Sequence, residues 1–215
     1  MATAIVVDNG EPNLPKCIAS LRRQTHAVRI VVAPGPQTDV RLAEELADEV
    51  LEPIRGIGAA RVNAIMKVED EFIISCDSDC IYDERYVEYA VQDLERYNAV
   101  KAGSIMPIED LLNLLGWLEA AFSVVVPYEF ALAFRRSAFL EAGCHLDVCE
   151  DPRCDIGLPV MTKLHPVIDW RMKVYARMPT YGAKVAASLT PSIIGGLTPL
   201  ATVTAIIATT GGIIK

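Results

Sequence analysis

The first 100 residues alternate between short apolar runs and segments with helical spacing, which limits the folds open to the chain. Runs typical of buried strands lie at residues 3–7, 28–33, 50–51 and 72–76. Segments in which apolar residues recur every three or four positions lie between and after them, at residues 14–21, 41–48, 56–67 and 86–97. Such an alternation is typical of a mostly parallel sheet covered by helices on both faces. We therefore expect an α/β fold of the Rossmann-like type.

Two carboxylates, Asp77 and Asp79, directly follow the strand at residues 72–76. The carboxyl edge of a parallel sheet is where open α/β folds bind ligands. Because side chains alternate along a strand, Asp77 and Asp79 are expected on one side and Ser78 on the other. Two oxygen donors placed in this way can hold Mn²⁺ or Mg²⁺, and such a cation can bridge the phosphates of a nucleotide. The alternative is a solvated acidic turn.

Composition narrows the classes of function. The chain has 215 residues, enough for one domain with a full core, and 52% of them are hydrophobic. Its formal net charge is −8, and the sequence contains no block of basic residues. A nucleic acid polymer is therefore not an expected partner. An acidic protein that binds a phosphate-bearing substrate needs a cation to offset the repulsion, which agrees with a metal at Asp77 and Asp79.

Other polar groups follow strands or begin helices, where they would face the same edge of the sheet. Asp8 and Asn9 come directly after the first strand. Residues 56–64 begin a helix with two glycines, which let the backbone approach a bound group, and a helix N-terminus attracts phosphate. Arg61 and Asn63 in this segment can add hydrogen-bond donors. The alternative is a glycine-containing loop that leads into an ordinary helix.

The order of these segments resembles that of the family-two glycosyltransferases of the GT-A fold. Members of that family combine a strand ending near Asn, a helix of the form L-x-x-C-L-x-S-L-x-x-Q-T, a G-x-x-x-A-R-N-x-G segment, a strand ending in D-x-D, an A-F-R-R-S-A-F segment and an acidic E-D pair. The matching residues here are 3–9, 14–25, 56–64, 72–79, 133–144 and 150–151. The resemblance extends over about residues 3–180. It implies a metal-dependent enzyme that uses a nucleotide-sugar donor.

The resemblance implies a role for each matching carboxylate. Asp77 and Asp79 would hold Mn²⁺ or Mg²⁺ on the diphosphate of the donor, where a Lewis acid helps the nucleoside diphosphate to leave. Asp151 would be the general base that deprotonates an acceptor hydroxyl for in-line attack, with inversion at the anomeric carbon. Asp155 is an alternative for this role, and Asp151 is favoured. His165 is a candidate third metal ligand, with a purely structural histidine as the alternative.

The resemblance also implies a set of nucleotide-sugar-binding residues, which comprises Asp8, Asn9, Gly56, Arg61, Asn63, Asp77 and Ser78. Of these, Asp8 and Asn9 are expected near the nucleoside and Arg61 near the donor phosphates. One departure concerns the base. The family usually ends its second strand with a D-D-G-S segment whose Asp reads the nucleobase, whereas residues 31–36 contain no acid before Asp39. A UDP-linked and a GDP-linked donor both remain open.

Two apolar segments bear on location and partners. Residues 111–126 predict an apolar helix, and residues 185–214 contain no charged residue. We therefore divide the chain into a glycosyltransferase domain at 1–184 and a segment at 185–215 that associates with a membrane or packs as a hairpin against the domain or a partner subunit of a homo-oligomer. An acceptor in the membrane, such as a lipid or polyprenyl phosphate, agrees with this division. Because residues 1–7 lack the features of a signal sequence, we expect a cytoplasmic enzyme, peripheral at the cytoplasmic membrane face.

Two other classes of function stay open. Nucleotidyltransferases share the layered α/β architecture, but they usually carry an arginine-containing, glycine-rich loop after the first strand, and residues 8–13 contain no arginine. A non-catalytic nucleotide-binding or scaffold relative is the other class. The six cysteines are expected to be buried free thiols. The alternatives are an internal disulfide or a zinc site formed by Cys144, His145, Cys149 and Cys154.

Overall fold

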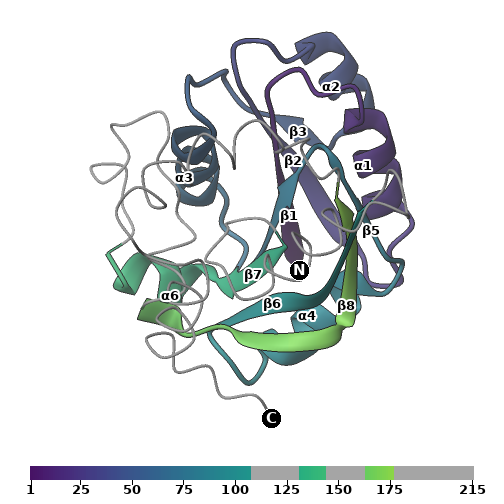
Figure 1. Cartoon of the computed structure of the whole chain (residues 1–215). Coiled ribbons are helices and arrows are strands. Elements are labelled where there is room, and N and C mark those ends of the chain that lie inside the picture. Colours follow the sequence, from purple (N-terminus) through teal and green to yellow (C-terminus); the bar gives the residue numbers. More distant parts are fainter. Residues whose placement is uncertain (108–130, 144–162, 177–215) are drawn as a thin grey trace, which may run out of the picture.

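The computed structural model of the chain describes residues 1–107, 131–143 and 163–176. In this part of the chain eight strands form one sheet, with helices on both of its faces (Figure 1). The strands are β1 (Ala2–Asp8), β2 (Val28–Pro34), β3 (Glu49–Val50), β4 (Phe72–Asp77), β5 (Cys80–Tyr82), β6 (Ala99–Pro107), β7 (Leu132–Arg135) and β8 (Val167–Ala176). The helices are α1 (Leu14–Arg22), α2 (Val40–Leu46), α3 (Ile57–Lys67), α4 (Tyr86–Leu94) and α6 (Arg136–Glu141). The strand order is β3-β2-β1-β4-β7-β6-β8-β5.

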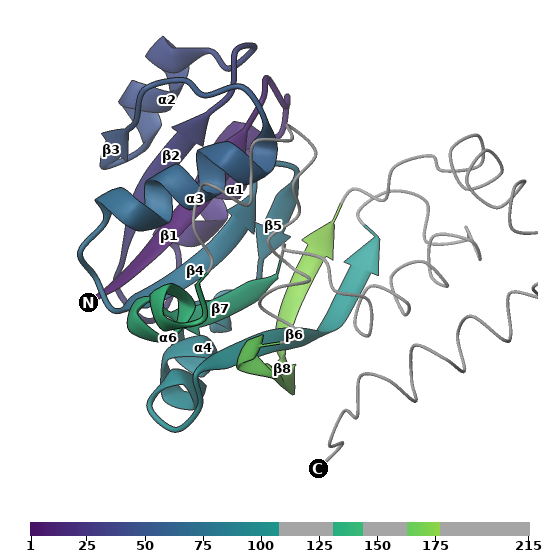
Figure 2. The same cartoon turned by 90° about the vertical axis from the view of Figure 1, so that its left-hand side faces the viewer.

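The parallel half of the sheet consists of β3, β2, β1 and β4, and it confirms the predicted α/β fold. Side chains of β1 alternate between two apolar cores. Ala4 and Val6 belong to the core shared with α1 and α4, whereas Ile5 and Val7 belong to the core shared with α3. Figure 2 shows α3 in front of these strands and α1 behind them. Because the four strands are parallel, the segments that follow them meet at one edge.

The predicted elements of the first hundred residues are present, with small shifts at their ends. The helix predicted over residues 86–97 ends earlier, at Leu94, as α4. The strand and helix predicted at 130–134 and 136–142 correspond to β7 and α6. Gly143 follows α6 with a φ of +70°, a conformation that glycine adopts readily and that commonly ends a helix. The sequence pattern and the helix-ending glycine therefore agree with the structure for β7 and α6.

Three strands, β5, β6 and β8, are not predicted by the sequence pattern. β6 pairs antiparallel with β7 and parallel with β8, so the sheet is mixed (Figure 2). The β6–β8 register shifts between Ala102 and Ser104, and at this point Gly103 packs closely against Trp170. A Cβ on Gly103 would lie 2.8 Å from the indole of Trp170. The bulge interrupts the period-two alternation of β8, which hides the strand from pattern analysis.

Several predictions concern residues outside the described ranges. They are the apolar helix at 111–126, the base Asp151 and the segment 185–215. Within residues 1–107, 131–143 and 163–176, no helix combines the length and apolar character needed to cross a membrane. The division of the chain at residue 184 therefore stays a prediction.

Candidate functional site

Arg61 connects helix α3 to the end of strand β4. Ser75 and Asp77 alternate onto the sheet face that α3 covers, so both lie within reach of this helix. The Arg61 side chain is fully buried, and its guanidinium donates hydrogen bonds to the Ser75 hydroxyl, the Asp77 carboxylate and, at 3.4 Å, the Cys76 carbonyl. The Asp77 side chain remains 31% exposed. Arg61 thus holds one oxygen of a carboxylate that still reaches the surface.

This placement changes the role expected for Arg61. The sequence prediction puts Arg61 near the donor phosphates, whereas the structure places its guanidinium beneath the sheet edge, against Asp77. A buried guanidinium is strongly destabilising without a carboxylate partner, so the pair fixes the position of Asp77. Arg61 is therefore a positioning residue for one of the two acidic side chains.

Asp79 lies near Asp77 because a turn follows strand β4. Strand β4 ends at Asp77, and Ser78 and Asp79 form the turn to β5, so strand alternation does not extend to Asp79 as predicted. Ser78 is buried, and its N–H donates to the Val7 carbonyl at 3.1 Å. The pKa of Asp79 is raised to about 6, first by burial and next by the negative charge of Asp77. The two carboxylates are therefore close enough to repel each other.

Asp77 and Asp79 fit a small divalent cation by the chemistry of their oxygens. Mg²⁺ is commonly bound by one or two carboxylates together with substrate phosphates and waters, and carboxylate oxygens also suit Mn²⁺. Within the described ranges, no group of three or more His, Cys, Asp or Glu side chains is arranged to hold a metal ion. The pair therefore suits a cation that takes its remaining ligands from a phosphate-bearing substrate and from water.

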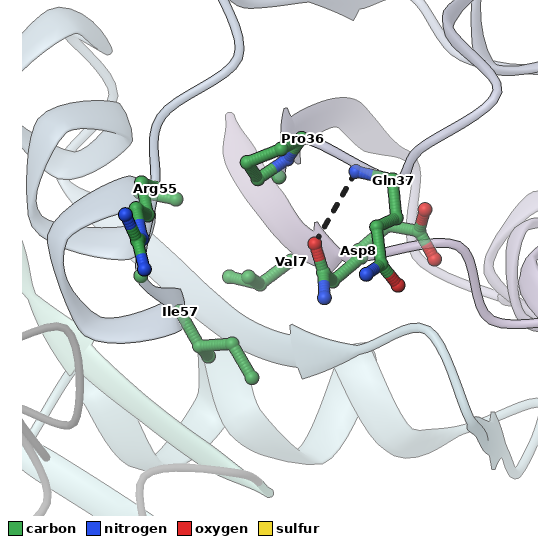
Figure 3. A pocket seen from close by; sticks show the side chains of 10 residues that line it. Val7, Asp8, Pro36, Gln37, Arg55 and Ile57 are labelled. Carbon is green, nitrogen blue, oxygen red and sulfur yellow. Dashed lines mark hydrogen bonds between the residues drawn. The ribbon is translucent and has the colours of Figure 1, made fainter.

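A pocket of about 390 Å³ opens at the ends of β1 and β2 and the beginning of α3 (Figure 3). Its lining consists of Val7, Asp8, Asn9, Gly35, Pro36, Gln37, Arg55, Gly56, Ile57 and Ala60. Three of the predicted donor-binding residues, Asp8, Asn9 and Gly56, are thus brought together. Val7 connects the pocket with the acidic pair, because it pairs with Asp77 across the sheet and accepts the hydrogen bond from Ser78.

The turn after β2 makes room for Asn9 in the pocket. A Cβ on Gly35 would lie 2.4 Å from Asn9 Oδ1, so a side chain at this position would displace Asn9. Asn9 Oδ1 also accepts a hydrogen bond from the N–H of Gln37 at 3.4 Å, drawn as the dashed line in Figure 3. Gly35 and Gln37 therefore fix the side chain of Asn9 at one wall of the pocket.

The two acids near this wall are already engaged in local structure. Asp8 is 2% exposed, and its carboxylate accepts hydrogen bonds from the N–H groups of Gly10 and Glu11 at 2.9 and 3.1 Å. Asp39 caps helix α2 and accepts from the N–H of Leu42 at 3.2 Å. The missing acid at the end of β2 is therefore not replaced by Asp39. Asp8 lines the pocket and shapes the loop that carries Asn9.

Sequence reasoning missed the other seven lining residues, among them Gln37, Arg55 and Ile57. Arg55 and Ile57 flank Gly56, which was identified from the helix-start motif, and Gln37 follows the Pro-Gly-Pro turn. The signal available in the sequence was that each of these three lies next to a glycine-containing turn or helix start. Which side chains of a turn point into a pocket depends on its backbone path, which the pattern does not give.

Strand register separates His165 from the acidic pair. The pairings from β4 through β7 and β6 to β8 place Ile168 level with Ser75. His165 precedes Ile168 by three residues, so it lies at the level where β4 begins, whereas Asp77 ends β4. The structure does not bring His165 to Asp77 and Asp79. Asn63 lies half-buried on α3 and is not part of the pocket lining.

Three cysteines surround the inner side of the acidic turn. Cys17, Cys76 and Cys80 are buried free thiols, as predicted, and the other three cysteines lie outside the described residues. Burial raises the pKa of each of these thiols, that of Cys76 to about 12. They are therefore neutral at physiological pH and act as small core residues. The Cys17 thiol donates to the Asp77 carbonyl at 3.4 Å.

The architecture and the pocket agree with a comparison against protein families. The model for "Glycosyl transferase family 2" matches residues 3–139. The chain belongs to this family. The match includes β1, α3 and β4, which carry the pocket and the acidic pair. No curated protein sequence matches the chain.

Solved glycosyltransferase structures share the fold at low sequence identity. S. aureus TarS superposes with a TM-score of 0.63 at 15% identity, over 82% of this family 2 chain and 36% of TarS. A shorter TarS structure in complex with UDP-GlcNAc gives a TM-score of 0.62 at 15% identity, over 83% of this chain and 58% of that one. Mannosyltransferase PcManGT from Pyrobaculum calidifontis, in complex with GDP-Man and Mn²⁺, gives 0.58 at 19% identity, over 86% and 59%. The chain thus spans well under two thirds of these proteins.

The Arg61–Asp77 pair yields a prediction about stability. Asp77→Ala removes the carboxylate that pairs with the buried guanidinium of Arg61, and we expect the free energy of unfolding to fall by about 3 kcal/mol. The double variant Arg61→Met, Asp77→Ala removes the buried charge as well and is expected to recover most of this loss. Urea unfolding in EDTA of both variants and of Arg61→Met alone completes a double-mutant cycle. Losses that simply add would contradict the coupling.

The raised pKa of Asp79 yields a prediction about pH. Because this pKa is about 6 in the folded protein and near 4 when unfolded, the folded state binds more protons between these values, and stability falls as pH rises from 4 to 6. Asp79→Asn removes the contribution of Asp79 to this fall, whereas the contribution of Asp93, whose pKa is likewise raised to about 6 by burial, remains. In metal-free buffer at pH 7.5 we expect the variant to be more stable than the unmodified chain, by about 1 kcal/mol.

Urea unfolding at pH 4.5 and 7.5 measures this difference. Glu44→Gln, which changes an exposed carboxylate on α2, is the matched control and should leave the pH dependence unchanged. An Asp79→Asn profile that falls between pH 4 and 6 as steeply as that of the unmodified chain would show that Asp79 does not contribute to the fall.

Proposed function

We propose that this chain transfers a sugar from a nucleotide-sugar donor, with Mn²⁺ or Mg²⁺, to an acceptor hydroxyl or a lipid phosphate. The observation that carries the proposal is the pocket at the strand ends with two carboxylates beside it. Structural relatives agree with this choice, since TarS has been solved with UDP-GlcNAc and PcManGT with GDP-Man and Mn²⁺. Without a cation, the acidic pair would repel the diphosphate of such a donor.

In this proposal the nucleoside occupies the pocket and the diphosphate extends toward the acidic pair. Asp77 and Asp79 hold the cation, which when bound offsets the charge that develops on the leaving nucleoside diphosphate. Arg61 keeps Asp77 at the sheet edge from below. Helix α3 begins at the pocket after Gly56, whose φ is +101°, and its first N–H groups favour a phosphate at this end.

The acceptor is proposed to be activated by Asp151. This residue lies outside the described ranges, and its role is supported by the resemblance of residues 150–151 to the acidic pair of the family. A carboxylate that removes the proton of an acceptor hydroxyl allows in-line attack on the anomeric carbon and hence inversion. Asp155 is the alternative base. The product anomer, determined by NMR, tests the stereochemical part of the proposal.

Asp79→Asn tests the function without disturbing the buried ion pair. Because the variant loses one of two charged ligands, we expect Mn²⁺-dependent hydrolysis of nucleotide-sugars to fall by about a hundredfold or more. Release of nucleoside diphosphate from UDP- and GDP-linked sugars, with Mn²⁺ or with EDTA, measures this loss. Glu44→Gln is again the control and should retain full activity.

Two results would argue against the proposal. Activity that persists in EDTA and in Asp79→Asn would exclude the metal role of the acidic pair. A failure of the unmodified chain to bind any nucleoside diphosphate in Mn²⁺ would favour a non-catalytic scaffold.

The acceptor is proposed to be a membrane lipid or polyprenyl phosphate, reached by an enzyme peripheral at the cytoplasmic membrane face. The support is the sequence of residues 185–214, which contains no charge, and the apolar segment 111–126. A segment of this composition lowers its free energy by contact with acyl chains. Packing against a second copy of the chain is the competing outcome.

Sedimentation with lipid vesicles tests this proposal. We expect the full-length chain to sediment with phosphatidylglycerol–phosphatidylethanolamine vesicles, and Ile206→Asp, Ile207→Asp to remain in the supernatant, because two buried charges are costly in the acyl region. Thr202→Ser is the control, since it keeps the segment uncharged. A variant that sediments as fully as the unmodified chain contradicts membrane binding through this segment. If the variant instead loses a dimer that the unmodified chain forms in solution, the segment packs against a second copy of the chain.

A further inference from the structure

We propose that the pocket selects guanine, so that the donor is a guanosine diphosphate sugar, and that Arg55 is the residue that sets this specificity. The inference rests on the proposed function and names the base that the function leaves open. Three observations support it. They are the position of Arg55, the engagement of both nearby acids, and the apolar residues that face each other across the pocket.

Arg55 is an exposed arginine at the rim of the pocket. It lies on the wall formed by the entry to α3, across from Gln37 and next to Ile57 (Figure 3). Among the described residues, its guanidinium has no hydrogen-bond or ion-pair partner, although the chain carries a net charge of −8. Its donors are therefore available to a molecule in the pocket.

Among the described residues, the pocket also lacks an available carboxylate. Asp8 is the single acidic side chain that they contribute to its lining, and both oxygens of Asp8 accept backbone N–H groups. Asp39 is used to cap α2. Neither guanine N1–H nor uracil N3–H therefore finds an available carboxylate here. The bases differ instead in how their acceptor atoms match the pocket.

A guanidinium distinguishes the bases by the spacing of their acceptors. Guanine presents O6 and N7 side by side, and arginine binds this pair with two parallel hydrogen bonds. Adenine places an N–H₂ donor beside N7, and uracil offers O4 beside a C–H group, so neither matches the fork. The amide groups of Gln37 and Asn9, on the opposite wall, can accept from the N1–H and N2–H₂ groups of guanine.

The walls of the pocket suit a flat ring. Ile57 is 49% exposed at the first position of α3, and Pro36 lies on the facing wall, with Val7 at the bottom between them (Figure 3). A purine placed between Ile57 and Pro36 would cover this apolar surface on both of its faces. The edge of the ring would then be directed to Arg55.

Calorimetric titration of the full-length chain in Mn²⁺ with GDP, UDP, CDP, ADP and 7-deaza-GDP tests the proposal. We expect GDP to bind at least about tenfold more tightly than the others, and 7-deaza-GDP, which lacks the N7 acceptor, to lose about tenfold relative to GDP. Arg55→Gln should lower GDP affinity by about tenfold or more, leave UDP affinity unchanged, and bind GDP and 7-deaza-GDP equally. Arg23→Gln, an exposed arginine after α1, is the control for charge.

The outcomes separate this inference from the proposed function. Binding of UDP or CDP as tight as that of GDP would overturn guanine selection while leaving a nucleotide-sugar enzyme. An equal loss of GDP and UDP affinity in Arg55→Gln would show that Arg55 attracts the diphosphate by charge and does not read the base. If no nucleoside diphosphate binds in Mn²⁺, the proposed function and the base selection both fail.

Discussion

The ion pair between Arg61 and Asp77 is the interaction on which the site depends. Helix α3 contributes a fully buried guanidinium to the core on its face of the sheet, and the end of β4 supplies a carboxylate. Taking such a charge out of water is expensive, so loss of the Asp77 carboxylate alone would destabilise this arrangement of helix and strand. The same helix begins at the pocket, and the same strand leads into the turn at Asp79. The ion pair therefore fixes the pocket and the acidic pair relative to each other.

Most elements of the first hundred residues, and α6 after them, were predictable because each carries its own signal. Apolar runs, helical spacing and a closing glycine specify β1, α1 or α6 without knowledge of their neighbours. The strands β5, β6 and β8 carry weaker signals. β5 has three residues, and β8 contains a bulge against Gly103 whose register depends on its partner strand. Such elements are determined by pairing across the sheet, which no local pattern contains.

The same distinction applies to the site. Asp77, Asp79, Asn9 and Gly56 lie directly after strands or before a helix, so strand direction alone brings them to one edge. Strand direction does not determine where a side chain points, nor the level at which a residue lies along a mixed sheet. Arg61 was expected to face a ligand but faces the core. His165 lies level with the beginning of β4, because β8, which begins two residues after it, joins the sheet through β6. Arg55 was overlooked because it belongs to a loop without regular spacing.

Charge is unevenly distributed along the pocket, and in the proposed function this distribution would orient the nucleotide. Arg55 lies at the end bounded by the turn after β2 and the entry to α3, and the two carboxylates lie at the other end, beyond Val7. A base rich in acceptor atoms is attracted by the first end, whereas a diphosphate is accepted at the second only together with a cation. In the proposed function, nucleotide and metal would therefore strengthen each other's binding, and by thermodynamic reciprocity each would do so by the same factor. A donor bound in reverse would place its diphosphate away from Asp77 and Asp79 and would lose this coupling entirely.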